Sequence, residues 1–240
     1  MIFRVALVSL LIFPQSRAFF FQGAPLALVY SGPGACGPKD GDCVRAAAEV
    51  ALKAGLRVEF VEPGKIKLNR LQKASVWIQP GGNAIDAALA ISKEERKLIR
   101  NFVANGGSYL GFCAGAFLAD AWADNANTVR GLGIIPVVSY DYASSTKPFM
   151  VMLNWQGKRR HVYFQGGGAF STPKKGDALV VATYPNGAPA VIYSVFGRGK
   201  VAISGPHPEA PPEWAESDGL KDLDGSDADL AHQMMTWLLL

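Results

Sequence analysis

The stretch at residues 108–120 contains the pattern Gly-x-Cys-x-Gly, in which Cys113 lies between Gly111 and Gly115. The apolar run before Cys113 is typical of a buried strand and the run after it of a helix, which places the cysteine on the turn between them. A nucleophile on so tight a turn needs small neighbours, and the start of the helix stabilises a thiolate. A small apolar residue packed at a strand end would give the same pattern. This stretch alone leaves both interpretations open.

A possible base follows a later strand pattern. Of the three histidines, His161, His207 and His232, only His207 comes directly after an apolar run and has a carboxylate, Glu209, two residues on. A carboxylate at this spacing can hold the imidazole in one tautomer, as a general base requires. A Pro-rich surface loop that happens to contain both residues is the alternative. His161 and His232 are expected to be structural or solvent-facing.

The elements that would position these residues alternate between strand and helix, which predicts an α/β protein with a mainly parallel sheet. Strands are expected within 25–31, 57–62, 73–82 and 108–112, and helices within 43–55, 92–107 and 114–122. Asp42 is a candidate N-cap, and Ser92 with Glu95 predicts a capping box. The second half is predicted to be strand-rich, with strands within 133–142, 149–157, 160–170, 178–185, 188–197 and 199–209, before a last helix in 227–240.

The N-terminus has the features of a secretory signal peptide. Arg4 supplies a positive charge, an apolar stretch follows to Phe13, and small residues flank Arg17. A buried first strand is the alternative, and the stretch is too short for a membrane span, which needs about 20 apolar residues. We therefore expect a signal peptide at 1–18 and a single domain at 19–240. The mature protein would be secreted or periplasmic, with no stable membrane insertion.

The remaining cysteines predict a small disulfide ring. Cys36 and Cys43 flank a Gly/Pro-rich loop, which leaves Cys113 as the free thiol. No Cys/His spacing typical of zinc is present, so no metal is expected, and no cofactor is predicted. The net charge of +4 is mild, and the short basic run 158–160 is expected to be a solvated turn. These features predict no nucleic-acid partner.

Together, "GFCAG" and the later "GPHPE" resemble the Cys…His-x-Glu arrangement of the class I glutamine amidotransferase-like superfamily, and most closely the biotin–protein ligase N-terminal domain. "VYSGPG" at 29–34, "QPGGNA" at 79–84 and "YFQGGGAF" at 163–170 add to the resemblance, which extends from about Leu26 to the C-terminus. It implies a flavodoxin-like three-layer sandwich with an added strand-rich second half.

The resemblance also implies roles for individual residues. Cys113 would be the nucleophile, His207 the base and Glu209 the group that orients it. Backbone N–H groups of Gly81 or Gly82, with that of Ala114, would form an oxyanion hole. The same pocket would be lined from the opposite side by Gln165, Gly166 and Gly167, although a glycine run is also ordinary turn geometry.

Three functions are compatible with this sequence. The first is a secreted cysteine hydrolase or amidase that acts by acyl transfer on a small amide or γ-glutamyl-type substrate. The second is a non-catalytic domain that binds a small ligand or a partner, and the third is a glutaminase-type subunit that needs a separate synthase. Biotin ligation is not expected, because the 240 residues are taken up by the N-terminal-type domain. The sequence does not indicate an oligomeric state.

Overall fold

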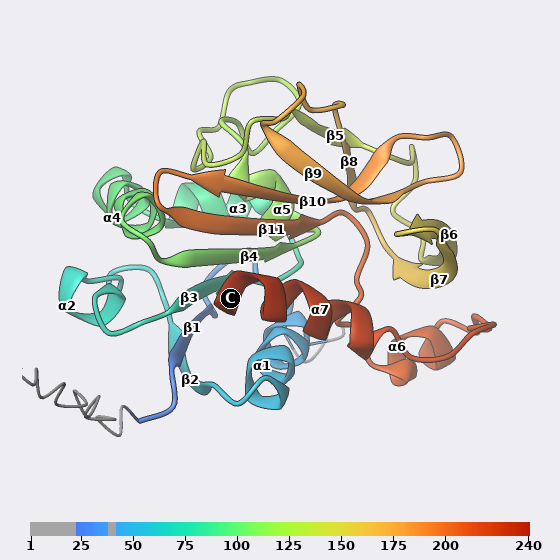
Figure 1. Ribbon diagram of the computed structural model, residues 1–240, viewed down its shortest axis with the longest axis horizontal. Helices are drawn as coiled ribbons and strands as arrows, with labels where there is room; N and C mark the ends of the chain where they lie inside the picture. Colours follow the sequence, from blue (N-terminus) through green and yellow to red (C-terminus); the bar gives the residue numbers. More distant parts are fainter. Residues whose placement is uncertain (1–22, 38–41) are drawn as a thin grey trace, which may run out of the picture.

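The computed structural model describes residues 23–37 and 42–240 (Figure 1). The predicted signal peptide at 1–18 lies outside the described residues. In the described part of the chain, nine strands form one sheet in the order β2-β1-β3-β4-β11-β10-β9-β6-β7, and β5 pairs with β8. The strands are β1 (Leu26–Tyr30), β2 (Arg57–Val61), β3 (Val76–Gln79), β4 (Ser108–Phe112), β5 (Ser139–Asp141), β6 (Phe149–Trp155), β7 (Lys158–Phe164), β8 (Gly168–Phe170), β9 (Ala178–Thr183), β10 (Pro189–Phe196) and β11 (Gly199–Ser204).

The large sheet has a parallel and an antiparallel half. Strands β2, β1, β3, β4 and β11 run parallel, and β10, β9, β6 and β7 continue the sheet in antiparallel pairs. The expected α/β fold with an added strand-rich second half is confirmed. The strand expected in 133–142 is shorter than predicted, because residues 131–134 instead bond to the backbone at 118–121 and Pro136 has no N–H to donate.

Helices cover both faces of the sheet (Figure 1). They are α1 (Cys43–Lys53), α2 (Leu68–Leu71), α3 (Ala84–Ala90), α4 (Lys93–Ala104), α5 (Ala114–Ala119), α6 (Pro212–Ser217) and α7 (Ala228–Leu239). In β1, Ala27 and Val29 pack with α1 and α7, whereas Leu26 and Leu28 face the cluster that contains α3, α4 and α5. This alternation gives the predicted three layers.

Two predicted helix caps are present. The Ser92 hydroxyl accepts from the Glu95 N–H, and the Glu95 carboxylate accepts from the Ser92 N–H, which is the capping box at the start of α4. The Asp42 carboxylate accepts from the Arg45 N–H at the start of α1. No helix in the residues that the structure describes is both long and apolar enough to cross a membrane.

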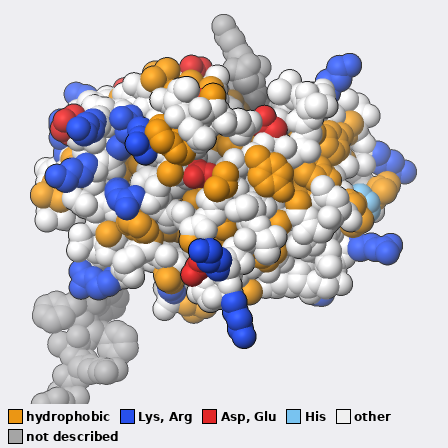
Figure 2. All heavy atoms as spheres, turned by 90° about the horizontal axis from the view of Figure 1, so that it is seen from above, with side chains coloured by type: hydrophobic (Ala, Val, Ile, Leu, Met, Phe, Trp, Pro, Cys, Tyr) orange, Lys and Arg blue, Asp and Glu red, His pale blue; other side chains and the backbone are white. Residues whose placement is uncertain are grey.

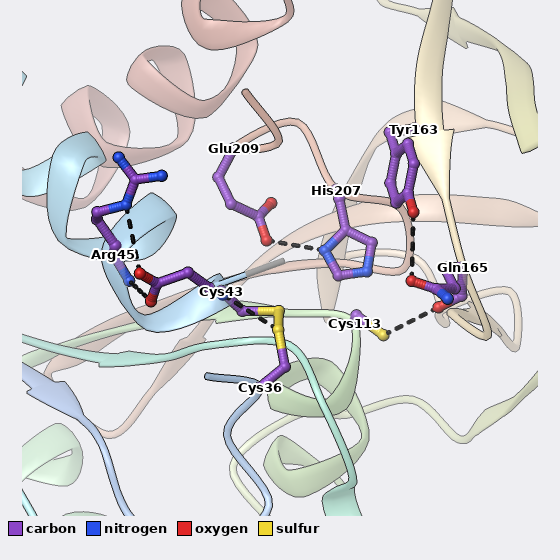
Figure 3. Close-up of a disulfide and its surroundings, with 9 residues drawn as sticks. Cys36, Cys43, Arg45, Cys113, Tyr163, Gln165, His207 and Glu209 are labelled. Carbon is purple, nitrogen blue, oxygen red and sulfur yellow. Dashed lines mark hydrogen bonds and ion pairs between the residues drawn. A yellow bond between two sulfur atoms is a disulfide. The ribbon is translucent and has the colours of Figure 1, made fainter. Parts of the chain in front are cut away.

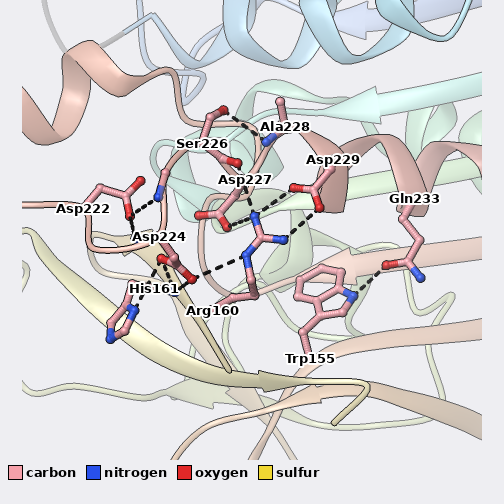
Figure 4. A network of polar contacts seen from close by, with 11 residues as sticks. Trp155, Arg160, His161, Asp222, Asp224, Ser226, Asp227, Ala228, Asp229 and Gln233 are labelled. Carbon is pink, nitrogen blue, oxygen red and sulfur yellow. Dashed lines mark hydrogen bonds and ion pairs between the residues drawn. The ribbon is translucent and has the colours of Figure 1, made fainter. Parts of the chain in front are cut away.

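Arg160 ties the C-terminal segment to β7 (Figure 4). Its guanidinium lies 2.8 Å from Asp229, 2.9 Å from Asp227 and 3.6 Å from Asp224, and its side chain is 17% exposed. The basic run 158–160 was expected to be a solvated turn. Instead it begins β7, and only its first two residues are exposed, because Arg160 is bound by the aspartates.

On the face seen in Figure 2, basic side chains lie at several separated places.

Candidate active site

The candidate site lies at the carboxyl ends of three adjacent parallel strands. Gln79 at the end of β3 pairs with Gly111 of β4, and Phe112 of β4 pairs with Ser204 of β11. The residues that follow these strands are Gly81, Cys113 and His207. Their convergence follows from the register, because parallel strands in open α/β sheets end together at the edge where ligands bind.

Cys113 has an unusual backbone conformation on the turn between β4 and α5. Its φ of 47° and ψ of −107° lie outside the regions that side-chain-bearing residues usually adopt. The Cys113 N–H donates to the Ser204 carbonyl oxygen at 2.8 Å, and a Cβ at Gly115 would overlap the Gln79 carbonyl oxygen. Neighbouring strands therefore hold the turn in place, as expected for a strained conformation retained at a functional position.

His207 lies against both Glu209 and Cys113. Its Nδ1 is 2.9 Å from Glu209 Oε1, and the opposite, Nε2 edge of the ring points toward Cys113 (Figure 3). The rings of Tyr163 and Trp214 pack edge-on against the imidazole, with centroids 5.9 and 5.5 Å away. The backbone N–H of His207 donates to the Tyr163 carbonyl oxygen at 2.9 Å. Glu209 and the two aromatic rings thus orient the imidazole, and the backbone bond holds the residue against β7.

The electrostatics favour a charged pair. Burial alone would lower the pKa of His207, but the negative charges of Cys113 and Glu209 outweigh it and raise that pKa to about 10. An imidazolium at neutral pH stabilises a thiolate at Cys113, which is the reactive form of cysteine. In its thiol form, the Cys113 Sγ lies 3.6 Å from the Gln165 carbonyl oxygen.

The predicted oxyanion-hole residues surround this pair. A Cβ at Gly81 would lie 2.6 Å from His207 Cε1, so this position admits the imidazole only because it is a glycine. The N–H groups of Gly82 and Ala114 form no hydrogen bond with acceptors among the described residues. They are free to bind a developing oxyanion, although that role stays a prediction.

A cavity of about 760 Å³ opens above Cys113 and His207. Of the other predicted site residues, Gly82, Gln165 and Gly166 line it. Three further predicted residues are buried behind the residues that line the cavity: Glu209, Gly81 and Ala114. Gly167 is also buried and packs against the Gly205 carbonyl instead of facing the cavity.

The predicted disulfide is present and forms part of the cavity wall (Figure 3). The Cα atoms of Cys36 and Cys43 are 5.2 Å apart. The Cys36 N–H donates to the Gly81 carbonyl oxygen at 3.1 Å, so the bridged loop is fastened to the segment that contacts His207. The pairing was predictable from spacing, but its place beside the nucleophile was not.

Sequence reasoning missed several wall residues. Trp214 and Asp218 follow a Pro-rich stretch without a recognisable motif, and Asp86 lies on α3, a helix that was not predicted. Asn83 was a detectable signal for α3, because its side chain caps that helix by accepting from the N–H groups of residues 85 and 86.

Comparison with known proteins identifies the family and supports the fold. Residues 26–128 and 139–235 match the sequence model of the family described as "Biotin-protein ligase, N terminal". A biotin–protein ligase from Schizosaccharomyces pombe is 27% identical over 190 residues, covering 69% of this chain and 29% of that protein. An uncharacterized protein from Chlamydia muridarum is 33% identical over 165 residues, covering 60% of this chain and 63% of its own length. The chain thus spans less than two thirds of either relative.

Solved structures share the fold at low sequence identity. A glutamine amidotransferase crystal structure aligns with a TM-score of 0.59 at 20% identity, covering 80% of this chain and 96% of that one. An exo-β-1,4-mannosidase from an Opitutaceae bacterium aligns with a TM-score of 0.54 at 15% identity, covering 90% of this chain and 36% of that one. Proteins with such different names share this fold, so the likeness describes architecture and not activity.

Proposed function

The chain belongs to the biotin–protein ligase N-terminal family, and on that premise we propose that it is a cysteine-dependent hydrolase that cleaves a small amide or γ-glutamyl-type bond by acyl transfer. One observation carries the proposal. Cys113, in a strained turn conformation, faces the Nε2 edge of a buried His207 whose Nδ1 is held by Glu209. A packing cysteine would need neither the backbone strain nor the oriented imidazole.

The reaction follows from these positions. The Cys113 thiolate attacks the amide carbon, and the N–H groups of Gly82 and Ala114 stabilise the oxyanion that forms. The His207 imidazolium gives its proton to the amine as the carbon–nitrogen bond breaks, which leaves a thioester and a neutral imidazole. Neutral His207 then takes a proton from water as it attacks the thioester, and collapse of the second tetrahedral intermediate releases the acid. The products are one acid and one amine, and the thiolate–imidazolium pair is restored.

Ligase activity is not part of this proposal. The region similar to the Schizosaccharomyces pombe biotin–protein ligase is 29% of that protein's length, so the similarity does not indicate ligase activity in this chain. Two alternatives use the same fold. A domain that only binds a ligand would not depend on the thiol of Cys113 for activity. A glutaminase-type subunit would depend on Cys113 but would act together with a separate synthase.

The test is hydrolysis of a panel of small amides and γ-glutamyl compounds in heavy-oxygen water. We expect acid that carries one heavy oxygen, with activity abolished in Cys113→Ser and lowered about 10²- to 10⁴-fold in His207→Gln, because that variant loses general acid–base catalysis. His232→Gln is the matched control, since His232 is exposed on α7. A panel that yields no acid with the folded protein, or equal activity in Cys113→Ser, would reject the hydrolase.

We propose in addition that the protein is exported. The support is the signal-like composition of residues 1–18 and the Cys36–Cys43 disulfide, since disulfides persist in oxidising compartments. N-terminal sequencing of the protein from its native host tests this, and a chain that retains Met1 or Arg4 would reject cleavage near Ala18.

A further inference from the structure

Carboxylates predominate among the charged side chains that line the cavity beside Cys113. Two are carboxylates, Asp86 on α3 and Asp218 directly after α6. The third is His207, whose Nδ1 lies 2.9 Å from the Glu209 carboxylate, so its positive charge is already paired. None of the described residues in this wall is a lysine or arginine. The cavity therefore has a negative potential that favours a cation at its mouth.

Asp218 is held in place for such a contact. The Tyr163 hydroxyl donates to Asp218 Oδ2 at 2.7 Å. Burial, followed by the nearby charges of Asp218 and Cys113, raises the pKa of Tyr163, so this hydroxyl remains a donor at neutral pH. One oxygen of the exposed Asp218 carboxylate is fixed by this bond, and its other oxygen can accept from a ligand.

Two buried aromatic residues stand beside Asp218 in the same wall. Tyr163 and Trp214 both line the cavity, and their ring centroids are 5.4 Å apart. Both rings pack edge-on against His207 and exclude water from that part of the wall. The attraction between a carboxylate and a cation strengthens where water is excluded.

Taking the proposed hydrolase as its basis, we propose that the substrate carries a cationic group, a primary ammonium or a guanidinium, which Asp218 and Asp86 bind while its amide carbon lies against Cys113. Asp218 is the principal specificity residue, because the Tyr163 hydroxyl holds its carboxylate in place. An anionic substrate meets two carboxylates in this cavity, with no basic side chain among the described wall residues to offset them. The pocket thus discriminates by charge as well as by reactivity.

Thiol reagents with the same reactive group and head groups of opposite charge test this without requiring turnover. Cys113 in the intact protein is treated with trimethylammonium-ethyl and with sulfonato-ethyl methanethiosulfonate, and each rate is divided by that of the same reagent with mercaptoethanol. We expect the normalised rate to be at least about tenfold higher for the cation, with the preference reduced toward one in about 1 M salt. Asp218→Asn and Asp86→Asn should each lower the ratio about fivefold.

Two controls define the signal. Asp177→Asn removes an exposed carboxylate that does not line the cavity, and should keep the wild-type ratio. Cys113→Ser should give no adduct, since the other two cysteines form the disulfide. A ratio near one, or one unchanged in both cavity variants, overturns the inference even if amides are hydrolysed. A strong cation preference without hydrolysis would retain the ligand class and reject the hydrolase instead.

Discussion

The Cβ position of Gly81 lies 2.6 Å from Cε1 of His207, closer than two unbonded carbon atoms can approach. The same position is 3.3 Å from Cys43 Sγ. A glycine in the turn after β3 therefore admits both the imidazole and the disulfide against one backbone segment. The positions of the base and of the bridge depend on this single missing side chain.

Gly81→Ala should displace His207 from Cys113. We expect the rate of amide hydrolysis to fall by about 10²-fold, because a shift on the order of 1 Å in a catalytic group costs that much. Gly37→Ala is the control beside the same disulfide, since its Cβ would meet no atom of the described residues within 4 Å. Circular dichroism should show both variants folded. Unchanged hydrolysis by folded Gly81→Ala would contradict a role for this close approach.

The charged pair predicts an unusual pH dependence for Cys113. The pKa of His207, about 10 in the folded protein, lies above its ordinary value of 6.5. The pair therefore stabilises the fold fully below pH 6.5, and this stabilisation is lost as the pH rises through about 10. Because His207 stays charged over this range, we expect the rate at which iodoacetamide alkylates Cys113 to fall less from about pH 8 to about pH 6 than that of an ordinary thiol, with a pKa of about 8.5, which falls nearly tenfold per unit.

His207→Ala supplies the contrast for this measurement. Without the imidazolium, the alkylation rate should acquire the steep dependence of an ordinary thiol. Nuclear magnetic resonance of the His207 ring in the unreacted protein should show protonation up to about pH 10, with a lower midpoint in Cys113→Ser because the thiolate charge is gone. An ordinary-thiol profile in the unaltered protein would mean that the pair is neutral.

Loss of the disulfide should destabilise the protein without unfolding it. For a sequence separation of 7 residues, the chain-entropy estimate gives a loss of about 2.5 kcal/mol in the free energy of unfolding for Cys36→Ser/Cys43→Ser. Urea unfolding of the double variant, and of the unaltered protein with and without reductant, measures this. Reductant should have no effect on the double variant. Equal stability in all samples would show that the loop is held by its other contacts.

Arg160→Gln should destabilise the fold more at high pH than at low pH. Burial raises the pKa of Asp227 to about 7, above its ordinary 3.8. Arg160 acts against this increase, and the charges of the neighbouring aspartates add to it. Deprotonation of Asp227 therefore costs folding stability as the pH rises from 3.8 to about 7. Without Arg160 the cost above pH 7 grows, and we expect a loss of about 3 kcal/mol there and a smaller one near pH 5.

Thermal unfolding at both pH values measures this difference. The double variant Arg160→Gln/Asp227→Asn should recover much of the stability at high pH, because no buried carboxylate remains without its cation. Arg159→Gln is the control, since Arg159 is exposed. A pH-independent loss in Arg160→Gln would assign the effect to packing of the arginine side chain.

The sequence carried much of this architecture in local patterns. The capping box at Ser92, the cap at Asp42 and the glycines around Cys113 are short-range signals, and each predicted an element at its proper place. The pairing of Cys36 with Cys43 was equally local. Such features depend on a few neighbouring residues, so they can be interpreted without knowing the rest of the fold.

Contacts between distant segments were not predictable in this way. Asp218 meets Tyr163 only because the segment after β11 packs against β7, and no spacing in the sequence encodes that approach. Arg160 was expected in a solvated turn. The aspartates that bind it lie more than 60 residues later in the sequence, so no local pattern indicated the ion pairs. The residue-by-residue roles of Cys113, His207 and Glu209 came from family resemblance and stay predictions about chemistry.

The two halves of the large sheet contribute different parts of the cavity. Cys113 and His207 follow β4 and β11 in the parallel half, whereas Tyr163 and Gln165 come from β7 and the residue after it, at the edge of the antiparallel half. The backbone of an edge strand is hydrogen-bonded to one neighbour only, so changes at the free edge of β7 leave the hydrogen bonds between β4 and β11 intact. Selectivity can thus diverge among descendants of this scaffold while the reactive turn is inherited intact.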